Sequence, residues 1–178
     1  MVDPGEERFI EVRRHSARSG SAADLSPFGI ELAAATGSDL DVDWAIASTK
    51  PRAQQTASAL GRDPDQILPL LNPQDHRLLE AGLTVASFDR LERGRYERRA
   101  GLDTLAADIR AALLEAWTEH PRMLVVSHMG IAELTILALA GSALPSDSPA
   151  MLGHCEGMRL AGDELDQISF RPAIAPAP

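Results

Sequence analysis

Residues 9–20 read FIEVRRHSARSG, a short apolar run followed directly by a cluster of positive charge. The first six residues have the pattern of a β-strand, and the small polar residues after them are typical of a loop. Arg14, His15 and Arg18 therefore fall at the carboxyl end of a strand, whereas Arg13 is expected on its opposite face. Because like charges repel, this clustering favours a pocket for an anion.

The rest of the chain alternates between predicted strands and helices. Residues 44–48 and 122–127 are short apolar runs typical of buried strands, and residues 66–71 form a weaker candidate. Helices are predicted over residues 25–37, 49–61, 102–120 and 130–141, and a β-hairpin over residues 155–172 turns near Gly162. The middle segment is less regular, and its charge-rich part is expected to be a solvated helix face or a mobile lid.

This alternation predicts a three-layer α/β/α sandwich with a mostly parallel central sheet. We expect a single domain over residues 1–172, with a cap segment at about 72–101 and a disordered tail at 173–178. Ligands of such sheets bind outside the carboxyl ends of the strands. Polar residues end three of the predicted strands: Arg14 with His15, Ser48 with nearby Arg52, and Ser127 with His128. These three ends are expected to meet at one edge of the sheet.

Composition excludes several classes of protein. The chain has 17 Lys and Arg against 26 Asp and Glu, and the resulting net charge of −9 argues against a nucleic-acid or anionic-membrane partner. The single cysteine, Cys155, rules out an intrachain disulfide, and the histidines lack the spacing of a zinc site. The N-terminus has no signal-peptide core, so we expect a cytoplasmic protein. We also expect no metal or other cofactor.

Four segments, in the same order along the chain, resemble the histidine phosphatase superfamily, also called phosphoglycerate mutase-like. VRRHSARSG is similar to its Arg-His-Gly signature, and LSPFGIELA to its LTxxGxxQA helix. ASTKPRAQQTASAL resembles SSPxxRAxQTAxxL, and LVVSHMGIAELTILALAG resembles xVVSHGGxxRxLxxxLLG. The resemblance covers most of the chain outside the middle third, and it is closest to a small member of the mutase branch.

This resemblance implies a role for each matched residue. His15 would be the nucleophile that becomes phosphorylated, Arg14 and Arg52 would grip the phosphoryl oxygens, and His128 would complete the pocket. Glu80 falls near the position of the family's acidic proton donor. These residue types suit the chemistry, because neutral imidazole is a nucleophile and guanidinium matches phosphate oxygens. Fixed arginines would stabilise the transferring group without a metal ion.

The chain also departs from the family pattern. Ser16 and Met129 replace glycines that follow the two histidines, and we expect Ser16 and Arg18 to line the phosphate pocket. Arg18 matches the further arginine of the acid-phosphatase branch. The proton donor is open, because Asp75 or Glu133 could serve instead of Glu80.

The predicted function is hydrolysis of phosphomonoesters through a phosphohistidine at His15, by a phosphatase related to the histidine acid phosphatases. The short cap favours a phosphatase and would admit a small phosphorylated metabolite, a phosphoprotein or a phosphohistidine. A mutase-like phosphoryl transferase and a phosphate-recognising module without turnover are the alternatives. The natural substrate and the oligomeric state are left open.

Overall fold

A six-stranded sheet with helices on both faces forms the centre of the computed structural model, which describes residues 7–20, 23–97, 101–140 and 144–177. The elements, in chain order, are β1 (Phe9–Arg14), α1 (Pro27–Thr36), β2 (Trp44–Ala47), α2 (Pro51–Ala59), β3 (Gln66–Ile67), the 3₁₀ helix η1 (Pro69–Leu71), α3 (His76–Glu80), α4 (Phe88–Tyr96), α5 (Leu102–Glu119), β4 (Arg122–Ser127), α6 (Ile131–Ala140), β5 (Gly157–Ala161) and β6 (Gln167–Arg171).

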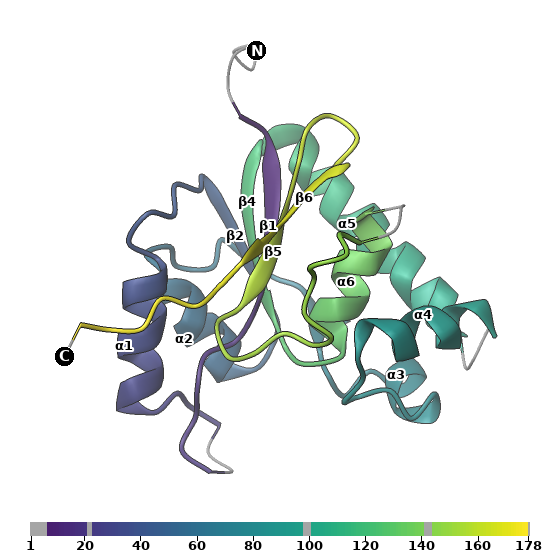
Figure 1. The fold of residues 1–178 in the computed structure, drawn as a ribbon, viewed down its shortest axis with the longest axis horizontal. Coiled ribbons are helices and arrows are strands. Elements are labelled where there is room, and N and C mark those ends of the chain that lie inside the picture. Colours follow the sequence, from purple (N-terminus) through teal and green to yellow (C-terminus); the bar gives the residue numbers. More distant parts are fainter. Residues whose placement is uncertain (1–6, 21–22, 98–100, 141–143, 178) are drawn as a thin grey trace.

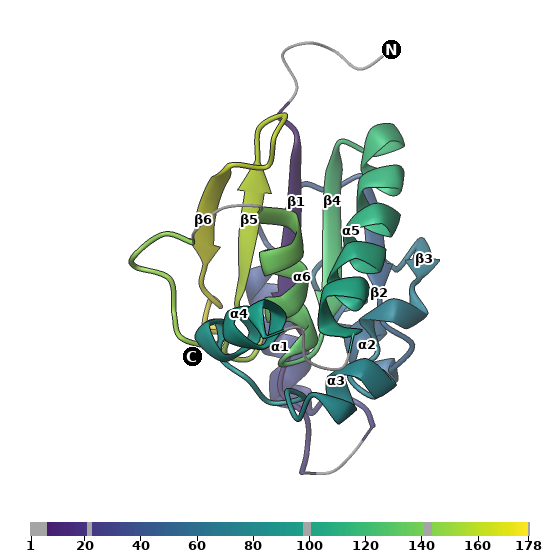
Figure 2. The same ribbon diagram turned by 90° about the vertical axis from the view of Figure 1, so that its right-hand side faces the viewer.

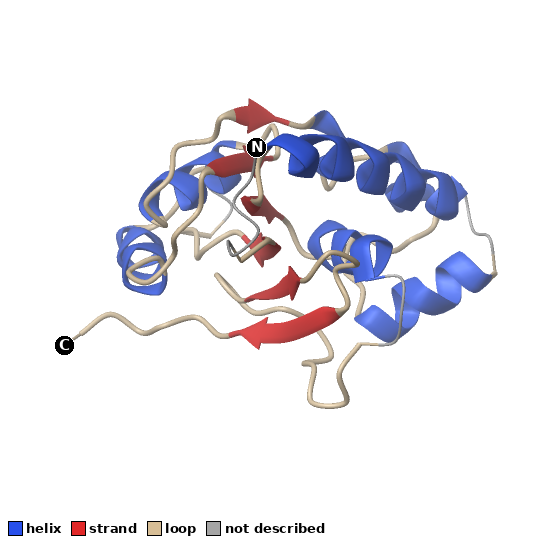
Figure 3. Cartoon of the chain, turned by 90° about the horizontal axis from the view of Figure 1, so that it is seen from above, coloured by secondary structure: helices blue, strands red, loops and turns tan. Residues whose placement is uncertain are grey.

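The strand order is β3-β2-β4-β1-β5-β6, as Figure 2 shows face-on. The pairs β3–β2, β2–β4 and β4–β1 are parallel, whereas β5 and β6 join as an antiparallel hairpin. Helices α1 and α2 cover one face, and α3 to α6 lie on the other (Figures 1 and 3). The α/β/α sandwich predicted from the sequence is confirmed.

Local signals in the sequence explain where the helices near the site begin. The Ser26 hydroxyl accepts a hydrogen bond from the Gly29 backbone at 3.0 Å, and Pro27 occupies the first turn of α1. Pro51 likewise begins α2, directly after β2. The tight β2–α2 turn therefore delivers Arg52 to the carboxyl edge of the sheet.

The two faces of the sheet carry different cores. Between the sheet and α1–α2 the buried side chains are mostly small, with Ala33, Ala53 and Ala57 beside Leu124 and Val126. The opposite core is larger and is built from leucine, isoleucine, phenylalanine and methionine side chains around α5 and α6. Small residues allow α1 and α2 to approach the sheet closely.

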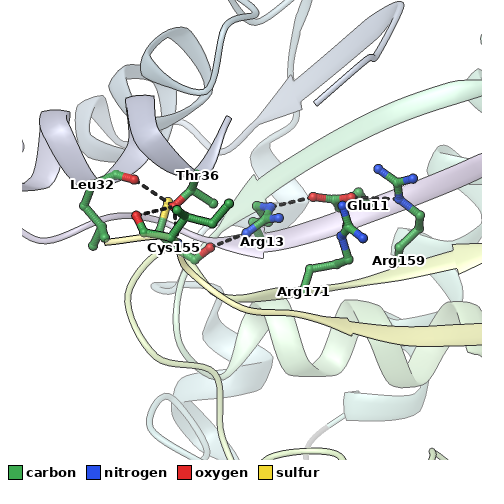
Figure 4. A network of polar contacts seen from close by, with 8 residues as sticks. Glu11, Arg13, Leu32, Thr36, Cys155, Arg159 and Arg171 are labelled. Carbon is green, nitrogen blue, oxygen red and sulfur yellow. Dashed lines mark hydrogen bonds and ion pairs between the residues drawn. The ribbon is translucent and has the colours of Figure 1, made fainter. Parts of the chain in front are cut away.

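A buried ionic network lies on the α1–α2 face beside β1. Glu11 is fully buried and accepts hydrogen bonds from Arg13 at 2.6 Å and Arg159 at 2.9 Å, with Arg171 at 3.5 Å. Arg13 also donates to the Cys155 carbonyl at 2.6 Å, so the network reaches the segment before β5 (Figure 4). Arg13 therefore faces away from Arg14, as the alternation of the strand predicts.

The middle segment and the tail are more regular than the sequence suggests. The cap contains α3 and α4, although residues 98–100 lie outside the described residues. The sequence predicts disorder from residue 173, but Ala173 packs against the small-residue core. The Ile174 backbone donates to the Thr36 hydroxyl at 2.9 Å, and Figure 1 shows this yellow segment running from β6 to α1. Hydrogen bonds between the Ile174 backbone and the Thr36 hydroxyl hold this segment against α1.

Candidate active site

Two imidazoles that are distant in the sequence meet at the carboxyl edge of the sheet. Arg14 and Ser127 are paired across the parallel strands β1 and β4, so the residues that follow them, His15 and His128, emerge side by side. Their ring centroids are 5.0 Å apart, and both residues are buried. The third predicted strand end joins them, because Ser48 lies 2.6 Å from His128.

The hydrogen bonds of His15 identify its tautomer. Nδ1 lies 2.7 Å from the Ser16 carbonyl oxygen, which can only accept, so Nδ1 carries the hydrogen. Nε2 of the neutral ring then holds a lone pair, and Arg52 Nε donates to it at 3.2 Å. The nitrogen that a nucleophile needs is therefore unprotonated and faces a guanidinium group.

His128 has the complementary arrangement. The Ser48 hydroxyl accepts a hydrogen bond from the Lys50 backbone at 3.3 Å and can donate its own hydrogen to His128 Nε2 at 2.6 Å. When the hydroxyl donates in this way, the hydrogen of the neutral ring is on Nδ1, which is buried and has no hydrogen-bond partner among the described residues. A buried N–H group of this kind is a ready donor for an oxyanion.

Both rings are uncharged at neutral pH. Burial is the main cause that lowers the pKa of His15 to about 3; the hydrogen bond to Ser16 opposes this, and Arg52, Arg14 and His154 lower it further. Burial also lowers the pKa of His128 to about 2, assisted by His15, Arg52, Lys50 and Arg14. Desolvation and neighbouring cations both disfavour a charged imidazolium.

Arg14, Arg18 and Arg52 surround the imidazole pair with positive charge. Burial lowers the pKa of Arg14 and of Arg52, and Arg18 contributes to both shifts, so the three guanidinium groups lie within electrostatic reach of one another. Arg14 Nη1 donates to the Leu152 carbonyl at 2.8 Å, whereas its buried Nε has no hydrogen-bond partner among the described residues. Clustered cations of this kind favour binding of a multiply charged anion.

The structure places Ser16 differently from the prediction. Ser16 is fully buried, its backbone N–H donates to Thr56 Oγ1 at 3.0 Å, and its hydroxyl lies beside the Cys155 thiol. Its carbonyl binds the His15 ring. Ser16 therefore orients the His15 ring through its carbonyl oxygen, and its hydroxyl lies against Cys155. The sequence could not show this, because the direction of a loop side chain depends on tertiary packing.

The three candidate acids either form contacts with other groups or are exposed. Glu80 is exposed at the end of α3 and forms no hydrogen bond or ion pair with the described residues. Asp75 caps α3 and pairs with Arg77 at 3.0 Å. Glu133 is fully buried and accepts from the Gly130 and Leu152 backbones at 2.7 and 3.0 Å. Among the described residues, none of the three carboxylates forms a hydrogen bond or ion pair with His15 or His128.

The turn after His128 explains how the chain tolerates Met129. Gly130, one position later, has φ of +83°, and a Cβ there would lie 2.8 Å from the Leu83 and Thr84 carbonyl oxygens. The half-buried Met129 precedes this close approach. The glycine that the packing requires is therefore Gly130, which brings the loop of residues 83–84 against the site.

A third histidine, His154, lies beside the site and was missed by the sequence reasoning. Its ring centroid is 5.8 Å from that of His15, and Cys155, its neighbour, donates a backbone hydrogen bond to the His15 carbonyl at 3.4 Å. It stands in the irregular segment before β5, where no motif marks it. Only the antiparallel pairing of β5 with β1 brings it to this edge of the sheet.

No group of three or more His, Cys, Asp or Glu side chains in the described part of the chain is placed to hold a metal ion. Within the same residues, no helix combines the length and apolar character needed to cross a membrane.

Comparisons with known proteins give a consistent architecture. No family model and no curated protein sequence matches the chain. Among solved structures, phosphoserine phosphatase from Entamoeba histolytica, in complex with 3-phosphoglyceric acid, matches with a TM-score of 0.60 at 14% identity, over 95% of this chain and 99% of that one. The chain has the phosphoglycerate mutase-like fold.

Proteins that share this fold differ in activity. The protein histidine phosphatase SixA, complexed with tungstate, matches with a TM-score of 0.54 at 18% identity, covering 94% of this chain and 97% of SixA. Phosphoglycerate mutase from Bacillus anthracis matches with a TM-score of 0.54 at 16% identity, covering 96% and 93%. The phosphoglycerate mutase-like fold is therefore confirmed, while the substrate has to be argued from this chain's own residues.

Proposed function

We propose that the chain is a phosphatase that hydrolyses phosphomonoesters through a phosphohistidine intermediate on His15. The observation that carries this proposal is the hydrogen bonding of His15, whose Nδ1 donates to the Ser16 carbonyl while Nε2 faces Arg52 at 3.2 Å. Such a ring is held as the tautomer that attacks phosphorus. The neighbouring His128, 5.0 Å away between centroids, supplies a second polar group for the same anion.

In the first step, Nε2 of His15 attacks the phosphorus of the ester. The P–Nε2 bond forms, the bond to the ester oxygen breaks, and that oxygen leaves with its electron pair and takes up a proton as an alcohol. Arg14, Arg18 and Arg52 would hold the equatorial oxygens, where negative charge accumulates in the transition state. His128 would donate from Nδ1 to one of them. This scheme assigns no step to a metal ion.

Hydrolysis, more than transfer to a second metabolite, is favoured by the short cap. The cap helices α3 and α4 lie on the α5–α6 face of the sheet (Figure 2), and His154, whose ring centroid is 5.8 Å from that of His15, is exposed. A short cap would leave a phosphorylated His15 accessible to water. It would also admit a phosphate carried on a larger molecule, such as a phosphoprotein.

The test is turnover of p-nitrophenyl phosphate in the presence of EDTA. We expect the wild type and His76→Ala, an exposed histidine on α3, to release phenolate, and His15→Ala to lose activity by at least about 1,000-fold. Tight binding of inorganic phosphate without turnover of any ester would refute the proposal in favour of a recognition module. Exchange of phosphate between phosphoglycerates with little release of free phosphate would refute it in favour of a mutase.

A further inference from the structure

Hydrolysis of a phosphohistidine is accelerated by a base that takes a proton from the attacking water. None of the carboxylates suggested by the sequence contacts either imidazole among the described residues. Both carboxylate oxygens of Glu133 accept hydrogen bonds from backbone N–H groups, and Asp75 forms an ion pair with Arg77. Glu80 is exposed and forms no hydrogen bond or ion pair with the described residues. The titratable group that does lie beside the nucleophile is His154, with 5.8 Å between the ring centroids.

The segment that carries His154 is held at both ends by groups of the site. On its N-terminal side, both backbone groups of Leu152 are hydrogen-bonded. The Leu152 N–H donates to Glu133 at 3.0 Å, and its carbonyl oxygen accepts from Arg14 at 2.8 Å. The next N–H, at Gly153, donates to Glu156 at 2.6 Å. Each of these bonds fixes backbone immediately before the histidine.

The C-terminal side is anchored just as firmly. Cys155 has φ of +63°, an uncommon conformation for a residue with a side chain, and its buried thiol fixes the turn. Its N–H donates to the His15 carbonyl at 3.4 Å, and its carbonyl accepts from Arg13 at 2.6 Å (Figure 4). Surrounding contacts that maintain an unfavourable backbone conformation are common at functional sites. His154 is therefore presented from a rigid turn, although its own side chain is exposed.

We propose that His154 is the general base that activates water for hydrolysis of phosphorylated His15, an inference that rests on the proposed function. In this step the water oxygen attacks phosphorus and the P–Nε2 bond breaks. The electron pair returns to Nε2 of His15, and one water proton moves to the His154 ring. Hydrogen phosphate leaves, and the exposed imidazolium of His154 then releases its proton to solvent.

The charges around His154 keep its ring ready to accept a proton. It faces Arg14 at the end of β1, and His15 and Arg18 from the loop that follows, while Glu156 of its own segment is bonded to the Gly153 backbone. Burial lowers the pKa of His154, Arg14 and Arg18 lower it further, and a hydrogen bond to the His15 backbone opposes them. The ring is thus neutral at pH 7, as a base must be.

Rapid mixing with p-nitrophenyl phosphate separates the two steps, because phenolate is released in the first and phosphate in the second. We expect His154→Gln to keep a burst of one phenolate per site but to lose about 100-fold in the following steady-state rate. Acid-labile phosphoenzyme should accumulate on this variant. His76→Gln, the matched control at an exposed histidine, should behave like the wild type.

Two additional readouts distinguish a base from a structural residue. In the wild type the rate of phosphoenzyme hydrolysis should fall in acid, at a pH below the ordinary imidazole value of about 6.5 because the pKa of His154 is lowered. This dependence should disappear in His154→Gln. Added imidazole should restore hydrolysis to His154→Ala.

The proposal is overturned if His154→Gln shows the wild-type steady-state rate, or if it loses the burst together with the steady-state rate. In both cases the wild type still turns over, so the proposed function stands. If the wild type itself forms no phosphoenzyme with any ester, the proposed function and this inference both fail.

Discussion

Replacing Glu11 with glutamine should destabilise the fold strongly, although it changes one atom. Glu11 and Arg13 are both buried, with their charged groups 2.6 Å apart, whereas Arg159 and Arg171 are more exposed to water. In Glu11→Gln the guanidinium of Arg13 is left buried without its counter-charge. Breaking a buried pair in this way costs about 3–5 kcal/mol. We take the lower value, about 3 kcal/mol, because glutamine keeps one hydrogen-bond acceptor.

Urea denaturation followed by circular dichroism measures this loss. With a slope of about 2 kcal/mol per M urea, a loss of about 3 kcal/mol shifts the midpoint down by about 1.5 M. The matched control is Glu31→Gln on the exposed side of α1, which should leave the midpoint almost unchanged. A midpoint shift in Glu11→Gln no larger than that of the control would show that the ionic network contributes little to stability and would refute the reasoning.

Two other predictions concern the imidazole pair and the turn beside it. Because the folded-state pKa values of His15 and His128, about 3 and about 2, lie below the usual value of 6.5, the unfolded chain binds more protons between these limits. The free energy of unfolding should therefore fall as pH drops below 6.5, by up to about 1.4 kcal/mol per pH unit for each ring. If the slope of the free energy of unfolding against pH is unchanged in His15→Asn, this prediction is wrong. In Gly130→Ala the new Cβ would lie 2.8 Å from the Leu83 carbonyl oxygen, so activity and thermal stability should both fall. The control is Gly82→Ala, at a position with φ of +67° and open space around it, which should lose less stability. Equal shifts of the melting temperature in the two variants would argue against the close approach.

The architecture could be predicted because its signals are local. Apolar runs of strand length, Ser26 with Pro27 at the start of α1 and Pro51 at the start of α2 all lie within a few residues of the elements that they define. The order of the elements then implies a parallel sheet, whose carboxyl edge gathers the strand ends. By contrast, the ordering of Ile174 depends on α1, which lies more than a hundred residues earlier in the chain.

The site was predictable in part for the same reason. His15 and His128 follow predicted strands directly, so topology alone brings them together. The Ser16 backbone N–H is hydrogen-bonded to Thr56, and no local sequence pattern predicts this contact. His154 escaped notice because it enters from an irregular segment and reaches the site through the antiparallel strand β5, which the parallel pattern does not include.

The position of β1 has a consequence for synthesis on the ribosome. Its neighbours in the sheet are β4 and β5, which begin at Arg122 and Gly157, whereas β1 itself begins at Phe9. During translation the central strand therefore emerges more than a hundred residues before either of its neighbours, with both hydrogen-bonding edges unpaired. Such late, non-local pairing slows folding and leaves strand edges exposed until β4 has been synthesised.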